Sequence, residues 1–222
     1  DTIADTAILP RDRRSDALAC YRTAFEENDP TAVLSLPRDL SDLTEYQQNP
    51  SERELLARLP ECFTILATQP VDDQRRIREL VLTLTQGMQM DLSVFPAEGE
   101  GKVVALETRA DLDRYTYFVA GCVGEFWTKI TVAHLPALQH WDVATMAVQG
   151  VRFGKGLQLT NILRDLAPDA RLGRCYLPRV DLAALGVRPE EMLHAGTLAR
   201  VRPLIDELLD LTLSHYREGW TY

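Results

Sequence analysis

Several features that mark other classes of protein are missing from these 222 residues. The four cysteines lie far apart and form no CxxC pair, which argues against a zinc ribbon or a thioredoxin-type site and favours reduced cysteines. The four histidines show no HExxH spacing. No apolar run approaches the roughly 20 residues that span a bilayer, and the amino end lacks a basic segment followed by a hydrophobic one. We therefore expect a cytoplasmic protein without a visible membrane anchor.

Positive charge is also scarce, because 24 Lys and Arg face 33 Asp and Glu, for a net charge of −9. This balance repels phosphate backbones, so no nucleic-acid partner is expected. An anionic small molecule would need a local cluster of arginines, or a metal ion, to be held.

Glycine and proline are sparse, and no long stretch alternates between apolar and polar residues as a strand would. Helical periodicity dominates instead, so the sequence predicts a single all-α domain over residues 1–222. Ser51 is predicted to cap a helix, with Glu54 returning the hydrogen bond. The predicted helices cover Asp16–Asn28, Ser51–Thr68, Asp72–Ser93, Thr108–His134, Asp142 to about Leu166, Glu190–Ala195 and Leu198 to the end. Residues 95–101 and 172–178 are predicted loops.

Two pairs of aspartates, Asp1 with Asp5 and Asp165 with Asp169, have a spacing of four, which places both side chains on one face of a helix. Like charges there repel weakly, whereas Mg²⁺ binds one or two carboxylates and completes its shell with water and substrate phosphate oxygens. Acidic pairs at this spacing also arise by chance on solvated surfaces. The second pair is set apart by its context, since leucines and isoleucine surround it together with Gln158, Asn161 and Arg164.

Small residues interrupt two of the predicted helices. Ala120, Gly121 and Gly124 fall in RYTYFVAGCVGEFW, and further glycines fall in GVRFGKG at 150–156. A glycine inside a helix costs about 1 kcal/mol relative to alanine, so a reason is needed. Either neighbouring helices approach closely, or a bulky ligand lies along this face. GVRFGKG is not a phosphate-binding P-loop, because its glycine spacing is short by one and it has no Ser or Thr after the lysine.

Four segments together resemble the squalene/phytoene synthase family of head-to-head prenyl transferases. They are DTIAD at 1–5, GMQMDL at 87–92, YTYFVAGCVG at 115–124 and LQLTNILRDLAPDARLGRCYLP at 157–178. The resemblance implies an all-α fold whose helices surround a deep pocket, with two aspartate motifs facing each other at its mouth. It also implies that this chain lacks family segments at both ends.

By the same resemblance, Asp1, Asp5, Asp165 and Asp169 would bind Mg²⁺ and, through it, prenyl diphosphate substrates. Arg164 and Arg174 match arginines that hold diphosphate. The other matching positions are the cavity residues Gln158 and Asn161 and the tyrosine of the first half-reaction, Tyr115.

The implied chemistry is ionisation of one allylic diphosphate, attack by a second prenyl chain, loss of a proton to give a cyclopropyl diphosphate, and a second ionisation with rearrangement. VAGCVGEFWTKI followed by HLPALQHW resembles bacterial squalene synthases, which implies farnesyl diphosphate as substrate and NADPH as reductant. Dehydrosqualene and phytoene are the alternative products, and a non-catalytic helical binding protein of the same fold is the alternative class. Peripheral membrane contact stays open because such substrates partition into lipid, and no oligomeric state is indicated.

One residue departs from a regular helix at the second motif. Pro168 leaves the Arg164 carbonyl without its helical partner and disfavours helix at Ala167. We therefore expect a kink before Asp169, which makes its role as a metal ligand less secure than that of Asp165.

Overall fold

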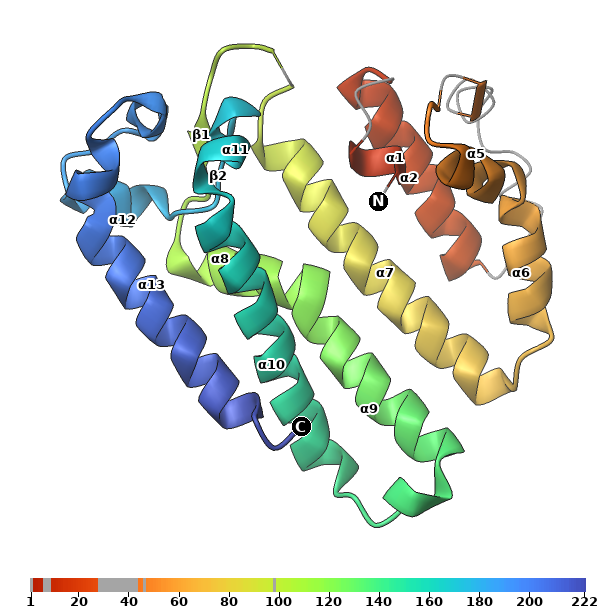
Figure 1. The fold of residues 1–222 in the computed structure, drawn as a ribbon. Coiled ribbons are helices and arrows are strands. Elements are labelled where there is room, and N and C mark those ends of the chain that lie inside the picture. The colour runs from red at the N-terminus through yellow and green to blue at the C-terminus, as the bar shows by residue number, and fades with distance from the viewer. Residues whose placement is uncertain (1, 6–8, 28–43, 46, 98) are drawn as a thin grey trace. The chain divides into compact units, whose positions relative to one another are not determined.

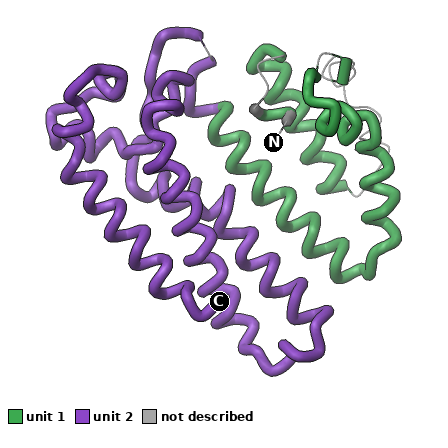
Figure 2. Tube along the Cα trace, in the orientation of Figure 1, with its two compact units in different colours: residues 1–92 green, residues 93–222 purple. Residues whose placement is uncertain are grey.

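The computed structural model describes residues 2–5, 9–27, 44–45, 47–97 and 99–222. Helices dominate these residues, so the all-α prediction is confirmed (Figure 1). The chain divides into two compact units, Asp1–Leu92 and Ser93–Tyr222 (Figure 2). That the two form one domain stays a prediction. No helix within the described ranges is long and apolar enough to cross a membrane.

Unit 1 is built on an aromatic cluster. Phe25 lies with its ring centroid 4.8 Å from that of Phe63, and the Tyr21 ring lies 5.0 Å from Phe25. Phe25 and Phe63 are buried, and such pairs add about 0.5–1.5 kcal/mol beyond their area burial. The helices in the described part of this unit include α1 (Thr2–Asp5), α2 (Arg11–Glu26), α5 (Pro50–Ala57), α6 (Leu59–Ala67) and α7 (Val71–Val94). The last of them extends two residues past the unit's boundary.

The start of α5 differs from the prediction. Asn49, not Ser51, is the N-cap, because the Asn49 side chain accepts hydrogen bonds from the backbone amides of Ser51 and Glu52. The predicted helix Ser51–Thr68 is also broken at Arg58, just before Pro60, which has no N–H to bond the preceding turn.

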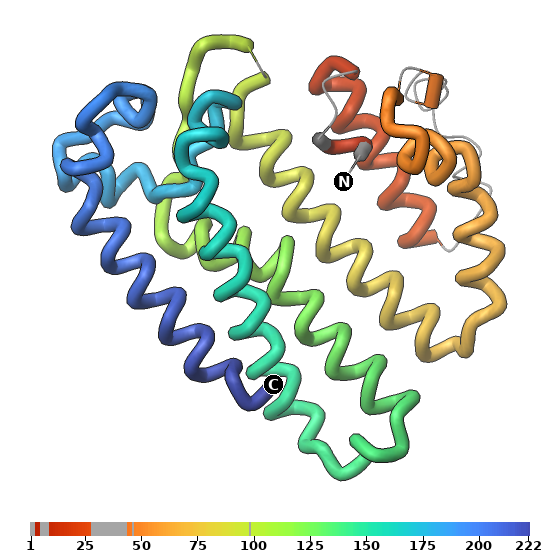
Figure 3. The backbone as a smooth tube through the Cα atoms, in the orientation of Figure 1, coloured from red at the N-terminus to blue at the C-terminus, as the bar shows by residue number. Residues whose placement is uncertain are grey.

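Unit 2 is a set of long helices with short connectors. Helix α10 packs against both α9 and α13 (Figures 1 and 3). The elements are β1 (Val104–Ala105), α8 (Arg109–Thr116), the π-helix η1 (Tyr117–Gly121), α9 (Cys122–His134), η2 (Pro136–Leu138), α10 (Val143–Arg164), α11 (Leu166–Arg171), β2 (Arg174–Cys175), α12 (Arg179–Ala184), η3 (Pro189–Leu193) and α13 (Thr197–Gly219). The predicted helix Glu190–Ala195 is a 3₁₀ turn, and the predicted Thr108–His134 helix contains the π-helical segment.

Helix α13 shows why periodicity predicted this unit well. Its buried residues recur every three or four positions, so that one stripe faces the core. Fully burying a leucine such as Leu208 contributes about 1.5–3 kcal/mol. The stripe consists of Val201, Leu204, Leu208, Thr212, His215 and Gly219.

Glycines set the distance between α10 and the helix before it. A Cβ on Gly124 would lie 2.0 Å from the Gly150 carbonyl oxygen, and one on Gly154 would lie 2.4 Å from the Ala120 carbonyl oxygen. Both distances are far below van der Waals contact, so only glycine fits. At these positions, close helix packing is the reason for the small residues, in place of the alternative of room for a ligand.

This contact predicts the outcome of two identical substitutions in α10. Gly154→Ala should destabilise the protein by about 1–3 kcal/mol, because backbone must move to admit the methyl group. Gly156→Ala is the matched control, since its Cβ would meet the ring of Tyr216 at 3.1 Å, a side chain that can shift, and alanine favours helix by about 1 kcal/mol. Urea denaturation measures both; equal midpoints for the two variants would contradict the backbone-contact account.

Candidate functional site

The carboxyl end of α10 separates polar from apolar side chains. Gln158, Asn161 and Asp165 are spaced to share one face, and the Asn161 amide donates to the Gln158 side-chain oxygen at 3.5 Å. Leu159 and Ile162 are buried in the core with 1% and 2% exposure. The leucines and isoleucine around the motif are therefore packing residues, at least at these two positions, while the polar face stays accessible.

Helix α10 ends four residues before Pro168, at the residue whose carbonyl has no helical partner because proline lacks an N–H. Arg164 is its last residue, Asp165 has φ −102° and ψ 15°, and a new short helix, α11, begins at Leu166. Pro168 lies in the first turn of α11, where a missing N–H costs least. The predicted break before Asp169 is confirmed, but it falls at Asp165; the prediction that Pro168 disfavours helix at Ala167 is wrong, because α11 already includes that residue. The two aspartates remain linked, since the Asp169 amide donates to the Asp165 carbonyl at 2.9 Å.

Two carboxyl groups four residues apart have opposite electrostatic surroundings. The Arg164 guanidinium donates from Nε to Asp165 Oδ1 at 2.9 Å and from Nη2 to Oδ2 at 2.6 Å, and this bidentate bond lowers the pKa of Asp165. Burial raises the pKa of Asp169 to about 6, and the charge of Asp165 adds to that, while Arg174 and Arg164 oppose it. Asp169 is thus a carboxylate that a cation would stabilise strongly.

Arg174 is placed by a two-residue parallel pairing. Val104 pairs with Arg174 and Ala105 with Cys175, and the Leu106 amide donates to the Cys175 carbonyl at 3.0 Å. Gly173 precedes this pair at φ 84°, and a Cβ there would lie 2.7 Å from the Lys102 carbonyl oxygen. Since α11 packs against β2, the pairing brings Arg174 into electrostatic range of Asp169 (Figure 1).

Tyr115 lies at the end of α8 and is buried. Its ring stacks on that of Tyr176, with centroids 4.8 Å apart, and its hydroxyl donates to the Tyr176 hydroxyl at 3.2 Å. Sequence reasoning missed Tyr176 as a partner, although the residue is part of the GRCYLP string. The signal for the pairing is non-local and is supplied by the β1–β2 contact.

The predicted first motif is only partly visible. Asp1 lies outside the described residues, and the structure describes Asp5 only as the last residue of α1. A metal role for Asp1 and Asp5, and the predicted arrangement of the two motifs face to face, stay predictions.

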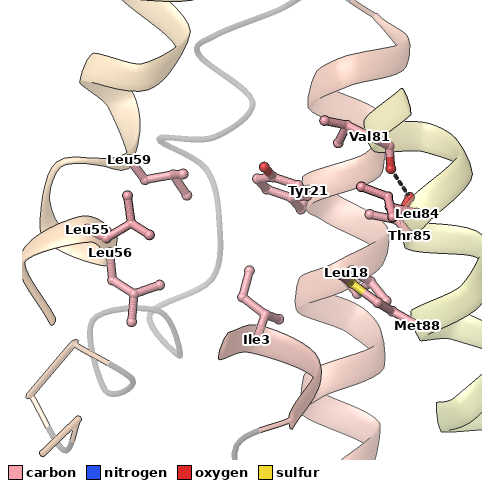
Figure 4. A pocket seen from close by; sticks show the side chains of 10 residues that line it. All are labelled: Ile3, Leu18, Tyr21, Leu55, Leu56, Leu59, Val81, Leu84, Thr85 and Met88. Atoms are coloured by element: carbon pink, nitrogen blue, oxygen red, sulfur yellow. Dashed lines mark hydrogen bonds between the residues drawn. The ribbon is translucent and has the colours of Figure 1, made fainter. Parts of the chain in front are cut away.

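A cavity of about 290 Å³ lies within unit 1 (Figure 4). The Thr85 hydroxyl in its wall donates to the Val81 carbonyl at 2.9 Å, so its proton does not need a hydrogen-bond acceptor from a ligand. Burial raises the pKa of Tyr21 to about 12, which keeps that phenol neutral. The lining is otherwise apolar and suits a hydrocarbon; its residues are Ile3, Leu18, Tyr21, Leu55, Leu56, Leu59, Val81, Leu84, Thr85 and Met88.

The residues of unit 2 fit a magnesium ion bound in its usual way. Among the described residues, no group of three or more His, Cys, Asp and Glu side chains could form a protein cage for a metal. Mg²⁺ needs no such cage, because it binds through one or two carboxylates and takes water and phosphate oxygens for the rest. Asp165 and Asp169 are two such carboxylates, and Arg164 and Arg174 lie within electrostatic range of Asp169. That these four residues bind a metal ion and an anionic substrate stays a prediction.

The whole chain, residues 1–222, matches the profile of a family described as squalene/phytoene synthase. A bifunctional lycopene cyclase/phytoene synthase of Aspergillus oryzae is 33% identical over 155 residues, which are 68% of this chain and 26% of that protein. A phytoene synthase of Thermus thermophilus is 36% identical over 116 residues, which are 52% of this chain and 37% of that protein. The alignments thus span about a quarter to two-fifths of these relatives' length.

Solved structures share the fold. A dehydrosqualene synthase in complex with a ligand superposes with a TM-score of 0.54 at 24% identity, over 97% of this chain and 69% of that one. A squalene synthase from Alicyclobacillus acidocaldarius gives a TM-score of 0.53 at 20% identity, over 99% of this chain and 86% of that one. At these identities the likeness extends to the fold alone.

The opposite pKa shifts of the two aspartates predict opposite effects on stability in metal-free protein. The pKa of Asp169 is raised in the folded state, so its contribution is lost as pH rises from about 4 to about 6. Asp169→Asn should therefore raise the urea midpoint at pH 7.5 relative to wild type, and by less at pH 4.5.

The matched control is Asp165→Asn. The pKa of Asp165 is lowered, so its contribution is present at neutral pH and is lost in acid. This variant should lower the midpoint at pH 7.5, by a small amount because the ion pair with Arg164 is exposed. Shifts of the same sign for both variants at pH 7.5 would show that the assignment is wrong.

Proposed function

Because this chain belongs to the squalene/phytoene synthase family, we propose that it catalyses the Mg²⁺-dependent head-to-head condensation of two prenyl diphosphates. The observation that carries the proposal is the junction of α10 and α11, where two carboxylates and two arginines come within electrostatic range of one another. A non-catalytic helical protein of the same fold would be free to lose these residues.

Each residue of the junction has a place in the proposed reaction. Asp165 and Asp169 would hold Mg²⁺, which neutralises charge on the leaving diphosphate when it is bound. Arg164 and Arg174 would bind the same diphosphate, because a guanidinium matches phosphate oxygens in a bidentate manner. In that state Arg164 exchanges its bond to Asp165 for one to substrate. Gln158 and Asn161 supply amide groups on the same face of α10.

Bond making then follows without a protein nucleophile. Ionisation of the first diphosphate leaves an allylic cation, which the double bond of the second prenyl chain attacks. Loss of a proton closes the cyclopropane, and the departing diphosphate or Tyr115 accepts that proton. The aromatic pair formed by Tyr115 and Tyr176 stabilises neighbouring positive charge through its π faces without trapping it.

Three products from two substrates are candidates. The string VAGCVGEFWTKI supports farnesyl diphosphate as substrate, with squalene as product when NADPH reduces the final cation and dehydrosqualene when a proton is lost instead. The Aspergillus and Thermus relatives, which are named as phytoene synthases, support geranylgeranyl diphosphate and phytoene.

The experiment that decides between them supplies the purified protein with Mg²⁺ and either farnesyl or geranylgeranyl diphosphate, with and without NADPH. Mass spectrometry of the hydrocarbons then reads the product. A C30 product that requires NADPH means squalene, a C30 product without it means dehydrosqualene, and a C40 product means phytoene. Absence of Mg²⁺-dependent diphosphate release from both substrates would refute the proposal.

The aspartate pair should be essential to that turnover. Asp165→Asn and Asp169→Asn are each expected to lower kcat/KM by about a hundredfold or more, since a metal contributes several kcal/mol of transition-state stabilisation. Glu107→Gln is the control, because this exposed carboxylate pairs with Arg179 elsewhere in unit 2 and should leave turnover unchanged. Diphosphate release is the measurement, and full activity of either aspartate variant would exclude the proposed metal site.

A further inference from the structure

The Tyr115–Tyr176 pair is more than ring packing. The rings stack with centroids 4.8 Å apart and planes at 26°, and the two hydroxyls lie 3.2 Å apart. Tyr115 is 5% exposed and Tyr176 is 6% exposed. Placing two phenolic oxygens in contact within a core is unfavourable unless they are bonded, so the hydroxyls are a specific feature of this site.

Tyr176 is the more firmly held member of the pair. It directly follows β2, whose backbone is fixed by the bonds from Val104 to Gly173 and from Leu106 to Cys175, both at 3.0 Å. Phe95 packs edge-on against its ring at 5.0 Å and is 2% exposed. The following residue, Leu177, is fully buried.

Tyr115 sits in a less regular setting. It lies one residue before the end of α8, and the next segment, Tyr117–Gly121, is a π-helix. Single π-helical turns inside α-helices are rare and are frequent at functional sites. A side chain at such a junction gains its orientation from tertiary partners.

The contact fixes where the Tyr115 oxygen lies. Ring stacking and the hydrogen bond between the two hydroxyls hold the Tyr115 phenol in one orientation. A polar group that is oriented in advance acts on developing charge without first reorienting.

We propose that Tyr176 is a positioning residue, which holds the Tyr115 phenol in the orientation used in the first half-reaction. This inference rests on the proposed function, in which Tyr115 serves the first half-reaction. Tyr176 itself need not touch substrate.

Hydroxyl deletions with the rings retained test the proposal. Tyr176→Phe should lower kcat for formation of the cyclopropyl diphosphate about tenfold, while KM stays within about twofold, because substrate binding is untouched. The double variant Tyr115→Phe/Tyr176→Phe should be no slower than Tyr115→Phe alone, since Tyr176 acts only through Tyr115. The first half-reaction is followed by diphosphate release, with product identified by mass spectrometry.

Thermal unfolding supplies a readout that is independent of turnover. Each single variant removes one partner of a buried hydrogen bond and should lower Tm. Tyr117→Phe is the matched control: its hydroxyl donates to Glu125 at 3.1 Å, away from the tyrosine pair, and its loss should leave kcat unchanged.

The outcomes separate the two proposals. A wild-type protein without Mg²⁺-dependent turnover overturns the proposed function and the positioning role with it. If the wild type is active, three results would each overturn the positioning role alone. They are a normal kcat for Tyr176→Phe, a double variant whose kcat falls by the product of the two single effects, and a Tyr117→Phe variant as slow as Tyr176→Phe.

Discussion

The backbone contact at Gly124, Gly150 and Gly154 is the constraint on which unit 2 depends. With no side chain between them, the chain segments approach until a carbonyl oxygen occupies the place of a Cβ atom. Helix α10 is thereby fixed against η1 and α9 on one side, and its packing on α13 is completed by Gly219, which fits against Gln149 and Phe153. The polar end of α10 is consequently a rigid platform rather than a free helix terminus.

The different surroundings of Asp165 and Asp169 result from the end of helix α10 at Arg164. A continuous helix would have placed Asp165 and Asp169 in equivalent surroundings on one face. The break at Asp165 instead leaves one carboxylate accessible and bonded to Arg164, while the other turns toward β2 and is half-buried. The pKa of one carboxyl group is therefore lowered and that of the other is raised, and a nearby cation would promote ionisation of the second.

Sequence reasoning succeeded where the cause is local. Helix α7 was predicted to within one residue because periodicity acts over neighbouring turns, and the break before Asp169 followed from the missing N–H of Pro168. It failed where the cause is distant. No sequence pattern around Arg174 predicts its pairing with Val104, and none around Tyr115 predicts its contact with Tyr176. The burial that shifts Asp169 likewise depends on packing against β2. The N-cap of α5 was wrongly predicted because Asn49 and Ser51 are both good capping residues. In the structure the Asn49 side chain accepts the hydrogen bonds from the first backbone amides of the helix.

The helix that contains the π-helical turn makes the tyrosine pair sensitive to chain length rather than to side-chain identity. A π-helix accommodates one residue more than the α-helix from which it departs. Removing one residue from Tyr117–Gly121 would let the α-helix run through with its flanking turns still in phase, so this segment has a residue to spare. Adding or removing one residue in the regular helix α9 would instead rotate everything before it by about 100°. Tyr115 would then leave the ring of Tyr176, although every residue of both motifs would still be present. In this part of the chain, insertions and deletions are therefore the changes that most directly separate fold from function.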